Sequence, residues 1–478
     1  MKTTETARPL DPSLIGRFAA IVGDAHALRA EADIAPYVRE QRGLWAGRTA
    51  LVLRPGSTSD VSAILRLAAE TGTAIVPQGG NTGLVGGQMP DRSGREVVVS
   101  MGRMNRVREL DLASNTATVE AGVVLQTLRD VAADNGRLFP LSLGSQGSCQ
   151  IGGNLSSNAG GTGVLAYGNA RELCLGVEVV LPGGDVLDDL RKLKKDNTGY
   201  DLKNLFVGAE GTLGIITAAV MRLVPMPRGR EVAWAGVPSP AAALDLFGRA
   251  TDLAGGGLTA FELCIDRSVD FTVKHIPGET APLAGRYPWY VLLEISSGRS
   301  AEDARSMIEQ VLEDGVEAAL IEDAVIAQNL AQAAAFWKLR ESMSDAQKPE
   351  GASIKHDVSV PVAAIPAFIE EAGAAVQRVC PGARLVCFGH MGDGNLHFNV
   401  SQPVGVKPEA FLALYRAMND AVHDVVRAFR GSISAEHGIG RMKRDELIAT
   451  APAVGIELMR RIKRAFDPAG IMNPGKVI

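Results

Sequence analysis

The residues of this chain best suited to chemistry are histidines that stand near a carboxylate in its C-terminal quarter. His390 and His397 lie in one short segment, and Glu436 and His437 are adjacent further on. The three histidines are among only seven in the chain. Two imidazoles and one carboxylate with an open position are the ligand set expected of a catalytic divalent metal ion. The pattern indicates a metal site made by His390, His397 and Glu436.

A β-hairpin is expected to carry the first two histidines. The Asp-Gly pair at 393–394 is a strong turn signal between two apolar runs, which predicts strands over Leu385–His390 and Asn395–Val400. Strand alternation puts Asn399 on the same face as His397, as a further ligand or as a partner of one. Histidines on apolar strands are more often hydrogen-bonded core residues, so simple packing is the alternative interpretation.

Length and composition describe a multidomain globular protein. The chain has 478 residues, 46% of them hydrophobic, which exceeds one ordinary core. The net charge of −5, with basic residues scattered, argues against nucleic acid as a partner. The five cysteines show no CxxC spacing, which favours reduced thiols. No signal-peptide pattern occurs over residues 1–9, and no window approaches the roughly twenty apolar residues of a membrane span. We therefore expect a soluble cytoplasmic protein.

Four regions are expected along the chain. Residues 1–45 form a helical lead-in, 46–225 a mixed α/β domain, 226–425 a second, α+β domain, and 426–478 a C-terminal segment. The boundary near 226 rests on a change of composition at prolines 225 and 227. In the second domain, helices are predicted over 302–315 and 325–347.

Three glycine-rich loops interrupt the first domain, at 77–87, 143–163 and 208–216. Backbone amides without obstructing side chains can form nests for pyrophosphate oxygens. None of the loops matches GxxxxGK[ST], or GxGxxG between a strand and a helix, which argues against ordinary nucleotide triphosphatases and Rossmann enzymes. Together the loops predict a long ligand threaded across the domain, and a dinucleotide such as FAD has that length.

Another candidate group lies around the helix expected near residues 336–344. Arg340 and Ser344 are four residues apart, and Lys355 follows a Pro-Glu-Gly turn. Two cations near a hydroxyl suit a small dicarboxylate, because arginine can bind one carboxylate with two parallel hydrogen bonds. A solvated helix face is the alternative interpretation.

These motifs, together with the runs 195–203 and 473–476, resemble in their order those of the FAD-linked 2-hydroxyacid dehydrogenases of the vanillyl-alcohol oxidase type. The resemblance covers residue 45 to the end and is strongest to the hydroxyglutarate enzymes. It implies an α+β fold in which a PCMH-type FAD-binding domain, completed by the C-terminal segment, holds an inserted cap domain with the substrate site. The cofactor-binding residues that it implies are Pro77, Gly79, Gly80, Asn81, Thr82, Gly83, Leu84, Gly144, Ser145, Ser148, Gly152, Gly153, Asn154, Ser157, Asn158, Gly160, Gly163, Glu210, Gly211, Gly214, Ile215, Ile216 and Asn473.

The resemblance also implies roles for the candidates already named. His390, His397 and Glu436 are the implied metal ligands, with zinc expected and manganese, iron and cobalt also compatible. His437 is the implied base. The implied substrate contacts are Arg340, Ser344, Lys355, Asn399 and His437. Serine at 344 departs from the threonine common in the family, which weakens the expectation for that contact. FAD is expected to be noncovalent, because no histidine lies between His26 and His275.

The implied reaction is the oxidation of D-2-hydroxyglutarate to 2-oxoglutarate by hydride transfer from C2 to flavin N5, while His437 takes the hydroxyl proton. Electrons would pass to an external acceptor such as electron-transfer flavoprotein, and a homodimer is compatible with the sequence. The same chemistry on D-lactate, glycolate or D-malate is the nearest alternative. A flavin reductase of the cell-wall-precursor type and a structural flavin-binding subunit are the others.

Overall fold

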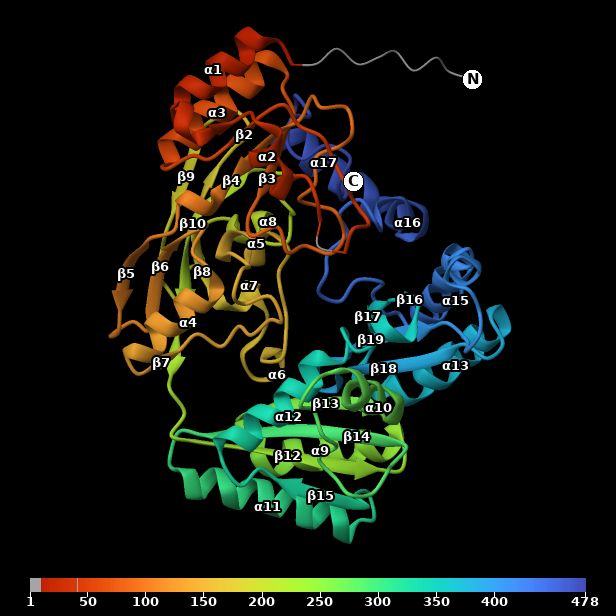
Figure 1. The fold of residues 1–478 in the computed structure, drawn as a ribbon. Coiled ribbons are helices and arrows are strands. Elements are labelled where there is room, and N and C mark those ends of the chain that lie inside the picture. Colours follow the sequence, from red (N-terminus) through yellow and green to blue (C-terminus); the bar gives the residue numbers. More distant parts are fainter. Residues whose placement is uncertain (1–9, 41) are drawn as a thin grey trace. The chain divides into compact units, whose positions relative to one another are not determined.

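The structure, a computed structural model, describes residues 10–40 and 42–478, so the expectation for residues 1–9 lies outside it. The chain divides into two compact units (Figure 1). Unit 1 comprises residues 1–160, 169–225 and 436–478, and unit 2 comprises 161–168 and 226–435. Residues 161–168 and 426–435, grouped above with the first domain and with the C-terminal segment, thus cluster with unit 2.

The described residues of unit 1 form three sheets. A four-stranded sheet has the order β1-β2-β4-β3, a five-stranded sheet has the order β5-β6-β10-β8-β9, and β11 pairs with β7. Their bounds are β1 Ala27–Leu28, β2 Val52–Leu53, β3 Ile75–Gln78, β4 Val97–Ser100, β5 Val107–Asp111, β6 Thr116–Glu120, β7 Arg137–Leu138, β8 Cys174–Val180, β9 Val186–Asp189, β10 Ile215–Arg222 and β11 Val224–Pro225. The helices are α1 Pro12–Val22, α2 Glu31–Ile34, α3 Thr58–Thr71, α4 Leu125–Asp134, α5 Ile151–Ser156, α7 Ala170–Leu173, α8 Lys203–Phe206, α16 Arg444–Thr450 and α17 Ala453–Phe466.

Helix α3 shows how local signals build this unit. The hydroxyl of Ser57 accepts the Asp60 N–H at 3.1 Å and so caps the first turn, and Gly72 ends the helix in the left-handed region at φ 64°. Its buried residues Val61 and Ile64 pack in one core with the strands of the four-stranded sheet. Strand β3 of that sheet runs directly into the first glycine-rich loop.

Unit 2 is built on one antiparallel sheet. Its order is β15-β12-β14-β13-β18-β19-β16, and β17 also pairs with β19. The strands are β12 Gly229–Val237, β13 Leu258–Ile265, β14 Trp289–Ser297, β15 Asp323–Ile326, β16 Ser353–Ile354, β17 Asp357–Ser359, β18 Arg384–His390 and β19 Asn395–Ser401. The helices are α6 Val164–Tyr167, α9 Pro240–Ala254, α10 Asp266–His275, α11 Ala301–Glu317, α12 Leu330–Ser342, α13 Ile365–Val379, α14 Pro408–Leu412 and α15 Tyr415–Ala428.

Strand alternation gives this sheet two apolar faces with different helices on them. Helices α9, α11, α13 and α15 share a core with the face that carries Phe261 and Phe398. Helices α10 and α12 pack with the opposite face, which carries Cys264 and Phe388. By the period of two, His390 and His397 belong to the face that α12 covers. The sheet therefore directs these histidines toward α12.

The predicted hairpin is confirmed, whereas the helix predicted over 325–347 begins too early. Strands β18 and β19 pair antiparallel with His390 opposite Asn395, and Gly394 ends the connection at φ 85°. Residues 325 and 326 lie in β15, which pairs with β12, and α12 starts only after Asn329. The Asn329 side chain caps the Gln332 N–H at 3.0 Å, so the backbone before it is free to pair as an edge strand.

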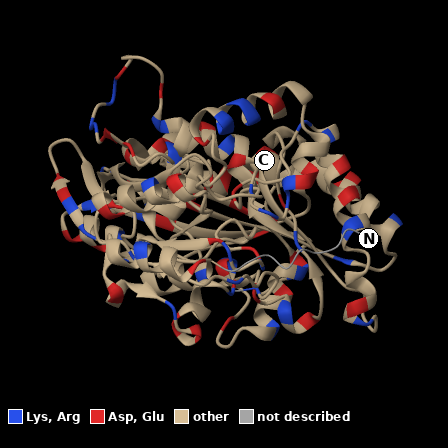
Figure 2. Ribbon diagram, turned by 90° about the horizontal axis from the view of Figure 1, so that it is seen from above, with Lys and Arg blue, Asp and Glu red and all other residues tan. Residues whose placement is uncertain are grey.

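No helix among the described residues is long and apolar enough to cross a membrane. Figure 2 shows acidic and basic residues interspersed along the ribbon rather than gathered by sign.

One carboxylate in unit 2, that of Glu350, should make the stability of the fold depend on pH. Glu350 contacts Nζ of Lys274 at 2.6 Å and Nε2 of His275 at 2.7 Å, and Arg384 also pairs with it. These contacts, led by the one from His275, lower the pKa of Glu350 to about 2. Because the folded pKa lies below the ordinary value, the stabilisation is present above pH 4.5 and is lost as the pH falls toward 2.

We therefore expect Glu350→Gln to lower the free energy of unfolding by about 1–3 kcal/mol at pH 7. Thermal unfolding followed by circular dichroism from pH 7 to 3 checks this. The gap between variant and wild type should narrow below pH 4.5, and a gap independent of pH would contradict the assignment.

Candidate flavin cleft and metal group

A cleft in unit 1 is lined by residues of all three glycine-rich loops. The space between its walls is about 890 Å³, including the part open to solvent. The lining comprises Pro77, Gln78, Gly79, Gly80, Asn81, Thr82, Gly83, Val85, Gly87, Gln88, Met101, Cys149, Gln150, Gly152, Gly153, Asn154, Ser156, Ser157, Glu210, Gly211, Gly214, Ile215, Ile216 and His437. The fold thus brings together loops that are far apart in the sequence.

Buried amide oxygens give this cleft its polar character. The side-chain oxygens of Gln78, Asn81, Gln150 and Asn154 are buried without a hydrogen-bond partner. Nδ2 of Asn81 donates to the carbonyls of Pro36 and residue 39, each at 2.9 Å, which turns its oxygen away from those groups. Unpaired buried acceptors are costly, so a ligand with hydroxyl and N–H donors would stabilise the cleft. The hydroxyls and ring N–H groups of FAD supply such donors.

Two glycines show how closely the cleft loops approach neighbouring backbone. A Cβ at Gly80 would lie 2.0 Å from the Ser148 carbonyl oxygen, and one at Gly152 would lie 2.6 Å from the Ala121 Cβ. Neither position can take a side chain without moving the backbone. Glycine at both positions lets the loop walls lie this close. Together with the buried amide oxygens described above, these walls fit a dinucleotide.

The remaining predicted cofactor residues do not line the cleft. Asn473 lies behind it, where Nδ2 donates to the carbonyls of Gly87 and Glu210 at 2.9 and 2.8 Å. Asn158 accepts the N–H of Arg171 at 3.0 Å. Gly163 lies in the segment that clusters with unit 2. The others outside the lining are Leu84, Gly144, Ser145, Ser148 and Gly160.

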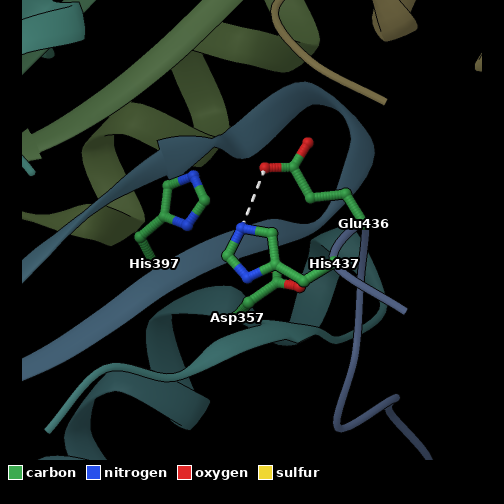
Figure 3. Close-up of side chains that lie close together, drawn as sticks. All are labelled: Asp357, His397, Glu436 and His437. Carbon is green, nitrogen blue, oxygen red and sulfur yellow. Dashed lines mark ion pairs between the residues drawn. The ribbon is translucent and has the colours of Figure 1, made fainter. Parts of the chain in front are cut away.

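Four side chains with metal-binding atoms lie together near the pairing of β17 with β19 (Figure 3). Asp357, His397, Glu436 and His437 each offer one ligand atom, and these atoms lie within 4.8 Å of one another. Asp357 stands opposite His397 in the antiparallel pairing. The Ala435 N–H donates to the carbonyl of Asp357 at 3.4 Å, which brings Glu436 to the same place. Two imidazoles and two carboxylates form a donor set that suits zinc, manganese, iron or cobalt.

Glu436 and His437 also face each other. Their Oε1 and Nε2 atoms are 3.7 Å apart, with side chains 17% and 21% exposed. His437 belongs to the lining of the cleft as well as to the four-residue group.

His390 lies beside this group and is oriented by a buried carboxylate. Its ring centroid is 5.6 Å from that of His397, and its Nδ1 is 2.8 Å from Oε1 of Glu262. Arg340 donates through Nε to Oε2 of the same carboxylate at 2.8 Å. Burial would raise the pKa of Glu262, but His390 and Arg340 outweigh it and lower that pKa to about 2. Because Glu262 is ionised, Nδ1 of His390 is the donor in this hydrogen bond.

Two of the predicted substrate-binding residues, Ser344 and Lys355, are hydrogen-bonded to each other. Nζ of Lys355 donates to the Ser344 carbonyl and hydroxyl oxygens, both at 2.8 Å. Arg340 lies in the last turn of α12, 5% exposed, with its guanidinium 4.9 Å from the centre of the Phe388 ring. Asn399 is 3% exposed on β19. Glu262 thus already binds one of the two cations.

Two family models match this chain. Residues 226–477 match the FAD linked oxidases, C-terminal domain, and residues 49–189 match the FAD binding domain. The chain belongs to the FAD-linked oxidases. Its α+β fold, with a FAD-binding and a C-terminal domain, is the one expected from the sequence.

Individual relatives agree with this membership. D-2-hydroxyglutarate dehydrogenase from Xanthomonas citri pv. viticola is 38% identical over 93% of each chain. D-2-hydroxyglutarate–pyruvate transhydrogenase from Saccharomyces cerevisiae is 33% identical over 100% of this chain and 97% of the relative. The solved structure of p-cresol methylhydroxylase has a TM-score of 0.75 at 16% identity, covering 97% of this chain and 96% of that one, which shows a common fold. This FAD-linked oxidase is a FAD-dependent dehydrogenase.

The sequence analysis of this FAD-linked oxidase missed Asp357 and Glu262. Asp357 joins the metal group, and Glu262 links a predicted metal ligand to a predicted substrate residue. Glu262 is an acidic residue within an apolar strand, and such residues are rarely buried unless paired. That signal could have marked Glu262, although it could not have named its partners; the strand of Asp357, Asp-Val-Ser, carries no such signal.

Proposed function

We propose that this protein oxidises D-2-hydroxyglutarate to 2-oxoglutarate with FAD and a divalent metal ion. The observation that carries the proposal is that His437 belongs both to the flavin cleft and to the metal-binding group. The reaction needs a base that takes the hydroxyl proton while the flavin takes the hydride, and an imidazole can do so. The naming of the relatives as D-2-hydroxyglutarate enzymes supports the choice of substrate.

Each side chain has a proposed task in this reaction. When bound, FAD supplies the hydride acceptor, and the metal ion supplies a Lewis acid that lowers the pKa of the α-hydroxyl. His390, His397 and Glu436 hold the metal, for which we propose zinc, and His437 accepts the hydroxyl proton at an imidazole nitrogen. Further substrate contacts fall to Arg340, Ser344, Lys355 and Asn399.

We further propose that unit 1 binds FAD noncovalently and that unit 2 carries the substrate residues. The cleft loops at 77–88, 149–157 and 210–216 contain no histidine for a covalent bond. Reduced flavin would then pass its electrons to an external acceptor such as electron-transfer flavoprotein.

One observation favours a second candidate substrate. Glu262 pairs with Arg340 at 2.6 Å and therefore neutralises part of the charge that a distal carboxylate would use. A smaller 2-hydroxyacid such as D-lactate needs no such charge. Lys355, fixed by Ser344, is then the residue whose substitution separates the two substrates.

The test is an anaerobic absorbance spectrum of the purified holoenzyme. We expect D-2-hydroxyglutarate to bleach the visible flavin band, and we expect prior metal removal with a chelator to slow bleaching by about a hundredfold or more. Readdition of zinc should restore the rate. Bleaching that the chelator leaves unchanged would contradict the role of the metal.

A substrate panel with Lys355→Met supplies the control. This variant should raise the KM for D-2-hydroxyglutarate by about tenfold or more, because it removes a charge-assisted contact to the distal carboxylate. Its KM for D-lactate should change little. Bleaching of the wild type by D-lactate alone would favour the second candidate.

A further inference from the structure

The carboxylate of Glu210 lies where the flavin cleft meets the chain that follows His437. Its Oε1 accepts the Ile439 N–H at 2.7 Å, and its Oε2 accepts the Gly440 N–H at 2.8 Å. One carboxylate therefore binds two successive amides that begin two residues after the proposed base. The segment 438–440 has no helix or strand of its own, and Gly438 and Gly440 have φ angles of 83° and 50°.

Close glycine contacts confine this carboxylate. A Cβ at Gly87 would lie 3.0 Å from its Oε2, and a Cβ at Gly438 would lie 2.8 Å from its Oε1. Asn473 donates to the carbonyl of Glu210 at 2.8 Å and so holds the backbone from the other side. Glu210 itself has a φ of 51°, in the left-handed region that non-glycine residues rarely adopt. Contacts from several sides thus hold the Glu210 carboxylate in one position.

We propose that Glu210 is a positioning residue for His437. It fixes the main chain at Ile439 and Gly440 and thereby sets where the imidazole stands in the cleft that both side chains line. The cofactor contact that the family resemblance implies for Glu210 would compete for the same oxygens, which already accept two amide N–H groups. The inference rests on the proposed function only in taking His437 as the base.

The conservative variant Glu210→Gln tests the proposal. Glutamine keeps the size of the side chain but replaces one acceptor oxygen by an NH₂ group, which would face an N–H donor. We expect the amides in a peptide covering 436–441 to exchange hydrogen about tenfold faster, measured by mass spectrometry on the holoenzyme. The rate of flavin reduction at saturating D-2-hydroxyglutarate should fall by about tenfold to a hundredfold, with KM little changed. The FAD content should stay at the wild-type level.

Glu120→Gln is the matched control in the same unit. Glu120 is 1% exposed and accepts the Arg106 N–H at 2.9 Å, and it does not line the cleft. It should leave exchange at 436–441 and flavin reduction unchanged.

Wild-type exchange at 436–441 in Glu210→Gln would overturn the proposal. So would a loss of FAD with a normal rate per bound flavin, because Glu210 would then be a cofactor contact. Failure of the wild type to oxidise D-2-hydroxyglutarate would instead count against the proposed function, while the exchange measurement still decides whether Glu210 holds the segment.

Discussion

Replacement of His437 by alanine is expected to slow reduction of the flavin by D-2-hydroxyglutarate by about a hundredfold or more. Without the imidazole, the hydroxyl proton must leave to water while the hydride leaves C2, and the transition state loses its positioned base. Anaerobic stopped-flow measurement of flavin bleaching gives this rate directly. His26→Ala, in the same unit but outside the cleft lining, is the control and should reduce the flavin at the wild-type rate.

Metal content distinguishes the two roles that the structure allows His437. Its ligand atom lies within 4.8 Å of those of Asp357, His397 and Glu436, so it could bind the metal as well as act as base. We expect His437→Ala to retain the metal, because His390, His397 and Glu436 are the proposed ligands. Loss of the metal in proportion to activity would make His437 a ligand, and an unchanged rate of bleaching would remove it from the reaction.

The parts of the site that the sequence predicts are those set by local signals. The turn at 393–394 and the alternation on either side were enough to place His390 and His397 on neighbouring strands. The glycine-rich loops likewise predicted a ligand site, because each run of glycines can be read directly from the sequence. Residues of all three loops line one cleft in the structure.

The parts that could not be predicted depend on pairing between distant segments. Asp357 meets His397 through the pairing of β17 with β19, and Glu262 meets His390 through the pairing of β13 with β18. The sequence around each acidic residue does not indicate which strand it will pair with or in which register. Pairing between distant segments also explains why residues 325 and 326 were predicted as helix. Their short apolar run does not distinguish a helix from a strand, and only the pairing with β12 makes it strand β15.

The largest effect on stability is expected from Glu262→Gln. Glu262 is 1% exposed and binds both Nδ1 of His390 and the guanidinium of Arg340. The variant removes the carboxylate charge that faces the buried Arg340, and arginine cannot lose its proton to escape the cost. We expect the free energy of unfolding to fall by about 3–5 kcal/mol at pH 7. Thermal unfolding in the presence and absence of the metal measures it.

A second consequence follows for the metal. Because Glu262 holds the ring of His390 by its Nδ1, the variant should also weaken metal binding by about tenfold to a hundredfold, measured by competition with a chelator. Glu294→Gln is the control on the same sheet face. Glu294 accepts the indole N–H of Trp337 at 2.9 Å, and its cation, Arg230, is 54% exposed and can return to water. That variant should lose some stability and keep its metal affinity.

The pH dependence gives the last check on Glu262. Its folded pKa of about 2 lies below the ordinary 4.5, so its contribution is complete above pH 4.5 and declines as the pH falls toward 2. The stability difference between wild type and Glu262→Gln should therefore shrink as the pH falls below 4.5. Equal stability and equal metal affinity at pH 7 would show that Arg340 and His390 find other partners, and the link between substrate residue and metal ligand would then be lost.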